Sequence, residues 1–282
     1  MKSSTRAQIA RESVEIVERG SYRLASGRVV EIAGAVRDCL EGTRHYLPEE
    51  LEGLRRDILG QPAPDQAAVI EVVNETTLAG VARVLAMGKG PVAALNFASA
   101  KNPGGGFLNG SQAQEESLAR SSALHASQMR ARDFYENHRA ATSLLYSDAM
   151  ILSPGCPIFR DDAGKLLDEP RLATFITSAA PNAGAAAYNR PEELRPIPGV
   201  FLRRSEYVLA LAASRGYGQL VLGAWGCGVF RNDPAVVARS FAAHLKQGPW
   251  SGRFERVVFS VLDTSPSQSI LRAFRAALVP GE

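Results

Sequence analysis

Residues 91–116 read PVAALNFASAKNPGGGFLNGSQAQEE, and this stretch decides the fold class. Residues 91–98 are apolar at nearly every position, as in a strand that is buried on both faces of a sheet. Three glycines follow, and a backbone without Cβ atoms can approach a ligand closely: Gly104, Gly105 and Gly106. After a spacer of seven residues, a predicted helix begins with Gln114, Glu115 and Glu116. Loop N–H groups can bind an anion while a carboxyl group transfers a proton, so this stretch suits a ligand with phosphates and a sugar.

The chain on either side of this stretch alternates between strand and helix patterns. Apolar runs predict further strands at residues 67–73, 149–153, 172–178, 219–224 and 256–263. Helical spacing of apolar residues predicts helices at 75–87, 113–135 with an interruption, 203–215, 234–246 and 268–278. Such alternation is typical of an α/β fold with a sheet covered on both faces, in which ligands bind at the carboxyl ends of the strands.

The first 66 residues differ from the rest of the chain. Their pattern predicts helices near residues 5–20, 32–40 and 47–54, with a short extended stretch at 28–32. A proline-rich connection at 61–66 then marks a boundary. We therefore expect an N-terminal helical extension over residues 1–66 and an α/β domain over residues 67–282.

A second glycine loop, GAWGCGVFRNDP at residues 223–234, follows the predicted strand at 219–224. Its glycines permit a tight turn, and its N–H groups could face a diphosphate. Phe230 offers a flat apolar surface against which an adenine could stack. The predicted binding residues of this loop are Gly226, Cys227, Gly228, Val229 and Phe230. Cys227 has no evident base or cation beside it, so we interpret it as a small filler of the loop rather than a nucleophile.

The two loops together resemble a known family. A Gly-Gly-Gly triplet, a spacer of seven residues and Gln-Glu-Glu look like the signature of poly(ADP-ribose) glycohydrolases of the bacterial type, within the macrodomain superfamily. Residues 226–230 resemble the diphosphate-binding loop of macrodomains. The resemblance covers roughly residues 67–265. It implies a three-layer α/β/α sandwich with a mixed sheet, and hydrolysis of the ribose–ribose O-glycosidic bonds of poly(ADP-ribose) to release ADP-ribose.

The resemblance also implies roles for single residues. Glu116 would be the general acid and then the general base, and Glu115 would position the substrate. Gln114 and the glycines Gly104, Gly105 and Gly106 would bind the substrate. Asn102 would contact the distal ribose; alternatively, it only satisfies the backbone of its own turn. Consecutive side chains on a helix diverge by about 100°, so a single-acid mechanism suits the adjacent glutamates better than a pair of facing carboxylates. A like charge beside Glu116 is expected to help it stay protonated.

Two other functions stay open at this point. The chain could be a macrodomain that binds ADP-ribose without cleaving it, since binding needs both loops but not the glutamate pair. It could also hydrolyse a different bond, such as the one that links ADP-ribose to a protein side chain. Whether cleavage would occur at chain ends or within chains does not follow from the residues.

Composition limits the kinds of partner and cofactor that the protein could have. The 282 residues carry 32 Lys and Arg against 29 Asp and Glu, and a net charge of +3 does not indicate direct nucleic-acid binding. Three scattered cysteines and four scattered histidines give no metal-ligand spacing, so we expect neither a metal nor another cofactor. No apolar run predicts a signal peptide or a membrane span. We expect a cytoplasmic protein, most simply a monomer, that acts on poly(ADP-ribose) or ADP-ribosylated proteins; the resemblance links it to the DNA damage response.

Overall fold

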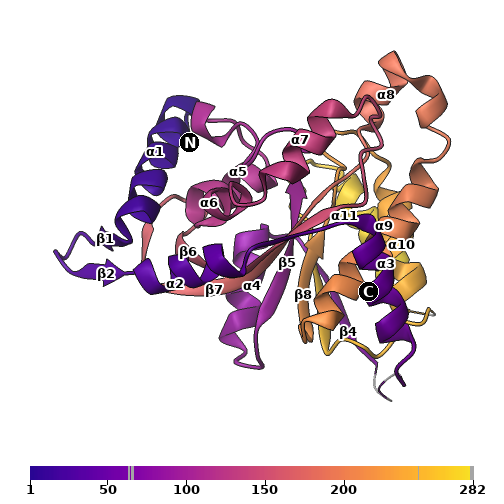
Figure 1. The fold of residues 1–282 in the computed structure, drawn as a ribbon, viewed down its shortest axis with the longest axis horizontal. Coiled ribbons are helices and arrows are strands. Elements are labelled where there is room, and N and C mark those ends of the chain that lie inside the picture. The colour runs from indigo at the N-terminus through magenta and orange to yellow at the C-terminus, as the bar shows by residue number, and fades with distance from the viewer. Residues whose placement is uncertain (63, 65–66, 247, 280–282) are drawn as a thin grey trace.

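A seven-stranded mixed sheet forms the centre of the molecule. The computed structural model describes residues 1–62, 64, 67–246 and 248–279 (Figure 1). The strands lie in the order β3-β6-β7-β5-β8-β9-β4. Their bounds are β3 Arg44–Tyr46, β4 Val69–Val73, β5 Val92–Ala98, β6 Met150–Arg160, β7 Leu166–Ala179, β8 Gln219–Gly223 and β9 Arg256–Ser260. β6 pairs antiparallel with β3 and β7, whereas the other neighbours are parallel.

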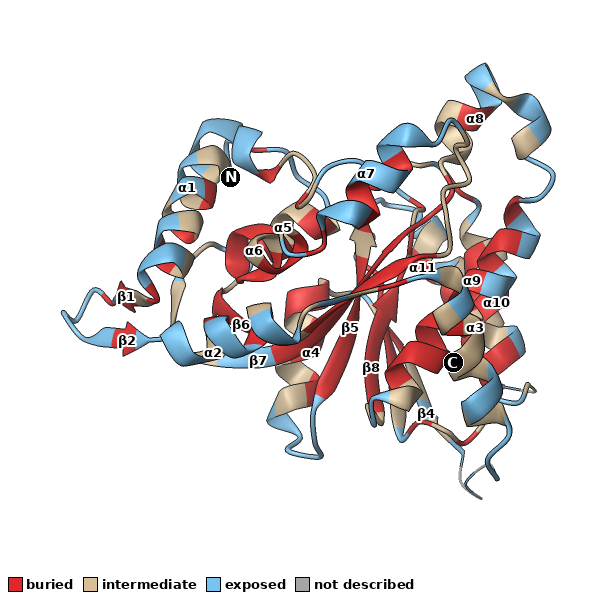
Figure 2. Ribbon diagram, in the orientation of Figure 1, coloured by how far each residue is buried: buried red, intermediate tan, exposed pale blue. Residues whose placement is uncertain are grey.

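Helices cover both faces of this sheet and make three layers. On one face, side chains of the sheet pack against α3 Pro48–Leu59, α9 Ile197–Ser214, α10 Pro234–Leu245 and α11 Ser269–Leu278. On the other face they pack against α1 Ser3–Arg19, α2 Ala33–Gly42, α4 Thr77–Ala86 and α5 Gln114–Ser121. Adjacent strand residues alternate between the two cores: Val221 joins one, and Leu220 and Leu222 join the other. Figure 2 shows β5 and β8 buried throughout most of their length. The predicted α/β/α sandwich is therefore confirmed.

The N-terminal segment contributes to the sheet as well as to the helices. Beside α1, α2 and α3 it forms a two-stranded hairpin, β1 Ser21–Arg23 with β2 Val29–Glu31. β3 adds an edge strand to the main sheet, and Leu51 of α3 belongs to the same core as α9. The first 59 residues thus share a core with the rest of the chain. The predicted boundary at residue 66 lies outside the described residues.

Most predicted elements are present, but several differ from the prediction. The long helix expected at 113–135 is three helices, α5, α6 Leu124–Gln128 and α7 Arg132–Ala140. β6 ends seven residues after the predicted strand, and β7 and α9 each begin six residues before the predicted start. α8 Ala183–Asn189, β1 and β3 were not predicted. Two short 3-10 turns complete the chain, η1 Phe107–Asn109 and η2 Pro191–Glu193. No described helix combines the length and apolarity that crossing a membrane requires.

Candidate active site

Both glycine loops line one cavity at the carboxyl ends of β5 and β8. Its volume is about 650 Å³. Eleven of the twelve predicted site residues line it, namely Asn102, Gly105, Gly106, Gln114, Glu115, Glu116, Gly226, Cys227, Gly228, Val229 and Phe230. The exception, Gly104, is buried beneath the loop, where a Cβ would press on the ring of Phe107. Gly104 therefore shapes the loop and does not reach the cavity wall.

The cavity begins where β5 and β8 separate. These strands pair only from Val92 to Ala94. Beyond that point the Gln114 side chain takes the place of β8: its Oε1 accepts from the Phe97 N–H (2.9 Å) and its Nε2 donates to the Leu95 carbonyl (2.8 Å). A side-chain amide thus completes the backbone bonding of β5. Gln114 was predicted to bind substrate. Its side-chain amide instead bonds to the backbone of β5 and holds the helix of the glutamate pair against the sheet.

Glu116 lies directly over the glycine loop. Its Oε1 accepts a hydrogen bond from the Gly106 N–H at 3.1 Å. Gly105 has a φ of +60°, and a Cβ at that position would collide with the Glu116 carboxyl group. Only glycine satisfies both the left-handed backbone and the close approach of the carboxyl group. Glu116 is half-buried at the cavity wall, so this carboxyl group can meet a ligand.

Glu115 is buried instead, with 3% of its surface exposed. Three donors surround its carboxyl group: the Ser99 N–H (2.7 Å), the Asn96 amide (3.1 Å) and the Gln128 amide (2.8 Å). Burial raises the pKa of Glu115 to about 7, although these three hydrogen bonds lower it; the charge of Glu116 adds a smaller increase. The raised pKa of Glu115 thus comes mainly from burial, and the like charge beside it contributes least.

The N-terminal helix α1 braces the glycine loop from outside. The Ser3 hydroxyl donates to the Gly110 carbonyl (3.2 Å), and Nε of Arg6 donates to the same oxygen (2.7 Å). About two helical turns farther along, the Ser13 hydroxyl donates to the Arg120 carbonyl at 2.6 Å, near the end of α5. Residues about a hundred positions earlier therefore fix both ends of the segment that carries the glutamates.

The second loop is held by its own Asn232 and by the segment that follows β7. Asn232 is buried, and its Nδ2 donates to the carbonyls of Gly226 (3.0 Å) and Pro181 (2.8 Å). Gly226 has a φ of +74°, and a Cβ there would lie 2.5 Å from Ala180 Cβ. Gly228 does not have a positive φ, so the expectation that both glycines are needed for the turn holds for Gly226 alone. A Cβ on Gly228 would meet no atom within 4 Å, because the residue faces open space.

Cys227 and Val229 complete this loop in different ways. Burial raises the pKa of the Cys227 thiol to about 12, and Asp233 adds to the increase, so the thiol stays protonated near neutral pH. This agrees with its interpretation as a filler. Val229 is 79% exposed at the tip of the loop. Asp233 caps α10, because its Oδ1 accepts from the Ala235 N–H at 2.8 Å.

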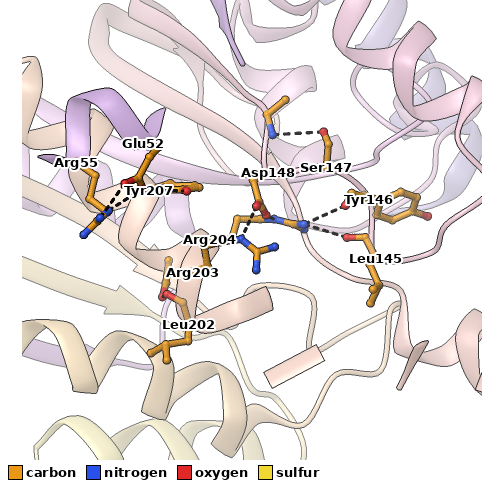
Figure 3. A network of polar contacts seen from close by, with 12 residues as sticks. Glu52, Arg55, Leu145, Tyr146, Ser147, Asp148, Leu202, Arg203, Arg204 and Tyr207 are labelled. Atoms are coloured by element: carbon orange, nitrogen blue, oxygen red, sulfur yellow. Dashed lines mark hydrogen bonds and ion pairs between the residues drawn. The ribbon is translucent and has the colours of Figure 1, made fainter. Parts of the chain in front are cut away.

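Phe230 packs on Tyr146, and a buried ion pair holds Tyr146 in place (Figure 3). The two ring centroids are 6.3 Å apart. Arg204 donates to the carbonyls of Leu145 (3.0 Å) and Tyr146 (3.2 Å) and binds Asp148 (2.8 Å). Burial alone would raise the pKa of Asp148, but Arg204 and Arg203 hold it below its ordinary value. This network fixes the segment behind Phe230, where Tyr146 adopts a φ of +57°.

Several cavity residues were not singled out as site residues by the sequence. Asp162 stands at the tip of the β6–β7 hairpin and accepts a hydrogen bond from the Thr76 hydroxyl at 2.6 Å. The cavity also takes wall residues that lie in or beside the two glycine loops, Phe97, Ser99, Gln112, Ser117 and Trp225. Thr77, Leu262 and Ile270 carry no local signal, because only the packing of distant elements brings them to the cavity.

No metal-binding cluster is found among the described residues. Nowhere in that part of the chain do three or more His, Cys, Asp or Glu side chains gather as ligands would.

Asn102 forms the turn before the glycines: its carbonyl accepts from the Gly105 N–H (3.0 Å), and its own N–H donates to the Ser99 hydroxyl (3.1 Å). Its exposed side chain lines the cavity, so neither of the two interpretations of Asn102 is excluded.

Comparison with known proteins assigns this architecture to a family. The family model described as "Microbial-type PARG, catalytic domain" matches residues 10–161. The crystal structure of poly(ADP-ribose) glycohydrolase (PARG) from Thermomonospora curvata is 49% identical, with a TM-score of 0.93 over 98% of this chain and 100% of that one. The same enzyme bound to the inhibitor ADP-HPD gives 50% identity and a TM-score of 0.89, over 96% of this chain and 98% of that one.

The enzyme from a second organism gives a similar result. PARG from Deinococcus radiodurans in complex with ADP-ribose is 47% identical, with a TM-score of 0.81 over 88% of this chain and 98% of that one. No curated protein sequence matches. A family match over more than half of the chain, with near-complete structural coverage at about half identity, leads to one conclusion: the chain belongs to the microbial-type PARG family.

Proposed function

We propose that this protein hydrolyses the ribose–ribose O-glycosidic bonds of poly(ADP-ribose), releasing ADP-ribose, and that Glu116 is its general acid and base. One observation carries the proposal. The Glu116 carboxyl group lies against the backbone of the glycine loop, in the same cavity as the second loop. A substrate whose diphosphate binds Gly226 to Phe230 would have its far ribose within the part of the cavity that Glu116 lines.

The chemistry follows from this arrangement. Protonated Glu116 would donate its proton to the leaving ribose oxygen as the glycosidic bond breaks, leaving an oxocarbenium-like sugar. The resulting Glu116 carboxylate would then take a proton from the attacking water, which restores the acid. Glu115 would carry a negative charge beside the developing cation and accept hydrogen bonds from sugar hydroxyls. Its carboxyl group is already oriented by Ser99, Asn96 and Gln128.

The glutamate pair also separates this function from its rivals. A reader of ADP-ribose would need the two loops but no carboxyl group at the glycine loop. The family's solved members include complexes with ADP-ribose, a ligand that either function would bind. Cleavage of the bond between ADP-ribose and a protein side chain remains the second candidate, because the same acid could serve it.

The test is a matched pair of isosteric variants. Glu116→Gln should bind ADP-ribose with nearly unchanged affinity and lose about 10²–10⁴-fold in the release of ADP-ribose from polymer. Glu115→Gln should also be impaired, with a larger share of the loss in KM. Polymer cleavage by Glu116→Gln at close to the wild-type rate would contradict the assignment. A parallel assay with EDTA should show no loss, which would favour a metal-independent reaction.

We further propose that the enzyme acts as a cytoplasmic monomer on poly(ADP-ribose) or ADP-ribosylated proteins. In support, both glycine loops and the glutamate pair of one chain meet in a single cavity. Sedimentation analysis of the purified protein at micromolar concentration would contradict the monomer if it gave twice the mass.

A further inference from the structure

Three polar atoms behind Glu115 have no hydrogen-bond partner within the described residues. They are Oδ1 of Asn96, Oε1 of Gln128 and the hydroxyl oxygen of Tyr135. All three residues are completely buried. Leaving one such atom without a partner is costly, on the order of 1–3 kcal/mol, so three of them in one region need an explanation.

The three atoms lie around the same carboxyl group. The amide nitrogens of Asn96 and Gln128 both donate to Oε1 of Glu115, at 3.1 and 2.8 Å. Each unpaired oxygen is bonded to the same carbon as one of those nitrogens, so both lie within a few ångströms of Oε1. Tyr135 packs in one buried cluster with Ala100 and Ala179, which lie just beyond Ser99 and Thr177 at the ends of β5 and β7. Burial raises the pKa of its hydroxyl, and the Glu115 charge adds to the increase.

Their hydrogen-bonding capacities complement one water molecule. A water donates two hydrogen bonds and accepts one or two, and an internal water typically makes about three. Two amide oxygens can only accept, whereas a tyrosine hydroxyl can donate. A water placed among them would donate to Asn96 and Gln128 and accept from Tyr135, which satisfies all three atoms at once.

We infer that Asn96, Gln128 and Tyr135 bind one internal water molecule beneath Glu115, and that this unit fixes the position and charge of the Glu115 carboxyl group during the reaction. The role in the reaction rests on the proposed function, but the water site does not. Donation by Tyr135 through the water polarises both amides, which strengthens their N–H bonds to the carboxylate. Glu116 is the ionisable group that shifts the pKa of Glu115, and Glu115 in turn raises the pKa of Tyr135. The other groups around Glu115 are neutral: Asn96 of β5, Ser99 just after it, Gln128 of α6 and, bonded to Asn96, Thr177 of β7. Asn96, Gln128 and Tyr135 are thus positioning residues.

Tyr135→Phe tests the unit, with Tyr22→Phe as its control. Tyr22 is equally buried, and its hydroxyl donates to the Leu167 carbonyl (2.9 Å), away from the cavity lining. Loss of the Tyr135 hydroxyl should make the Glu115 carboxylate harder to form. The acid limb of the pH profile of kcat/KM should move up by roughly half a unit to one unit, and the rate should approach the wild-type rate at high pH. Tyr22→Phe should leave the profile unchanged.

Two further measurements test the water site independently of the proposed function. A high-resolution crystal structure should show density for one water in contact with the three atoms. A ¹³C NMR titration of the Glu115 carboxyl carbon, assigned with Glu115→Gln, should show the same upward shift in Tyr135→Phe, whether or not Glu116 proves catalytic. A folded Tyr135→Phe protein whose Glu115 titrates as in the wild type would overturn the inference, as would density in which the side chains fill the space without water.

Discussion

The two loops of the cavity are held by different parts of the chain. The glycine loop depends on α1, since Ser3 and Arg6 both bind its Gly110 carbonyl. The second loop is closed by its own Asn232, which binds Gly226 six residues earlier, and it is tied to the start of α8 through the Pro181 carbonyl and the Gly184 N–H. The loop against which the Glu116 carboxyl group lies is therefore braced by the N-terminal helix, while the loop proposed to bind the diphosphate is braced by the segment after β7.

The two loops also have different tasks, since one orients a reacting group and the other is proposed to bind a diphosphate. Orientation of a reacting group tolerates little error, and a displacement of about 1 Å can cost 10²-fold in rate. A loop that presents N–H groups to a diphosphate needs only a fixed backbone and open space in front of it. Changes in the glycine loop should therefore affect the rate, and changes in the second loop should affect affinity.

The largest effect should come from Gly105→Val. Valine is disfavoured at a φ of +60°, and its Cβ would displace the Glu116 carboxyl group. We expect polymer hydrolysis to fall about 10²–10⁴-fold, as for loss of the general acid. Gly27→Val is the control, because Gly27 has a φ of +87° in the β1–β2 turn and no atom within 4 Å of its Cβ position. Near-normal hydrolysis by a folded Gly105→Val protein would contradict the role of the loop.

The free energy of unfolding should depend on pH through Glu115, which follows the glycine loop. The pKa of Glu115 rises from 4.5 to about 7 on folding. A group whose folded pKa is raised contributes stability below its unfolded pKa, and this contribution is lost as the pH rises through the folded value. From pH 4.5 to 8, the wild type should lose up to about 3 kcal/mol in free energy of unfolding relative to Glu115→Gln.

Urea unfolding across this pH range gives the measurement, and Cys227→Ala gives the matched change in the second loop. The Cys227 thiol, with a pKa of about 12, stays neutral throughout the range. The difference between wild type and Cys227→Ala should therefore be constant with pH. A constant difference for Glu115→Gln would contradict the burial of an ionising carboxyl group.

Gly228→Val should separate affinity from folding. A Cβ there meets no atom within 4 Å and the backbone is not left-handed, so the fold should be unchanged. The new side chain would project into the cavity, and ADP-ribose affinity should fall by about tenfold or more, or roughly 1.4 kcal/mol. Calorimetric titration alongside circular dichroism measures both. Unchanged affinity would mean that the second loop is not the diphosphate site.

The smallest effect should come from Arg6→Ala. It removes one hydrogen bond that braces the glycine loop, worth about 1 kcal/mol, so kcat should fall by roughly fivefold. ADP-ribose affinity should change by less than about twofold, because the second loop is untouched. The exposed Arg11 on the same helix provides the control variant Arg11→Ala. An effect on affinity rather than on kcat would mean that the two loops are not supported independently.

The sequence predicted what local patterns encode. The strand at 91–98, both glycine loops and the glutamate pair were found because each has its own period or spacing. The dependence of the glycine loop on α1 could not be predicted, since Ser3 and Gly110 are 107 positions apart and no pattern links them. For the same reason Gln114 was expected at the ligand rather than in the gap between β5 and β8. The sequence also could not predict that Glu115 is buried while the adjacent Glu116 is only half-buried, because this difference arises when α6 packs behind the pair.

The brace between α1 and the glycine loop has a consequence for biosynthesis. α1 is translated about a hundred residues before the loop that it supports, so Ser3 and Arg6 have no Gly110 carbonyl to bind until that loop has been synthesised. Closing so long a stretch is entropically costly and tends to occur late in folding. The β1–β2 hairpin and α2 can form meanwhile from neighbouring residues. A ribosome-bound intermediate would thus have its scaffold before its reactive geometry, and catalytic competence would be among the last properties that the nascent chain acquires.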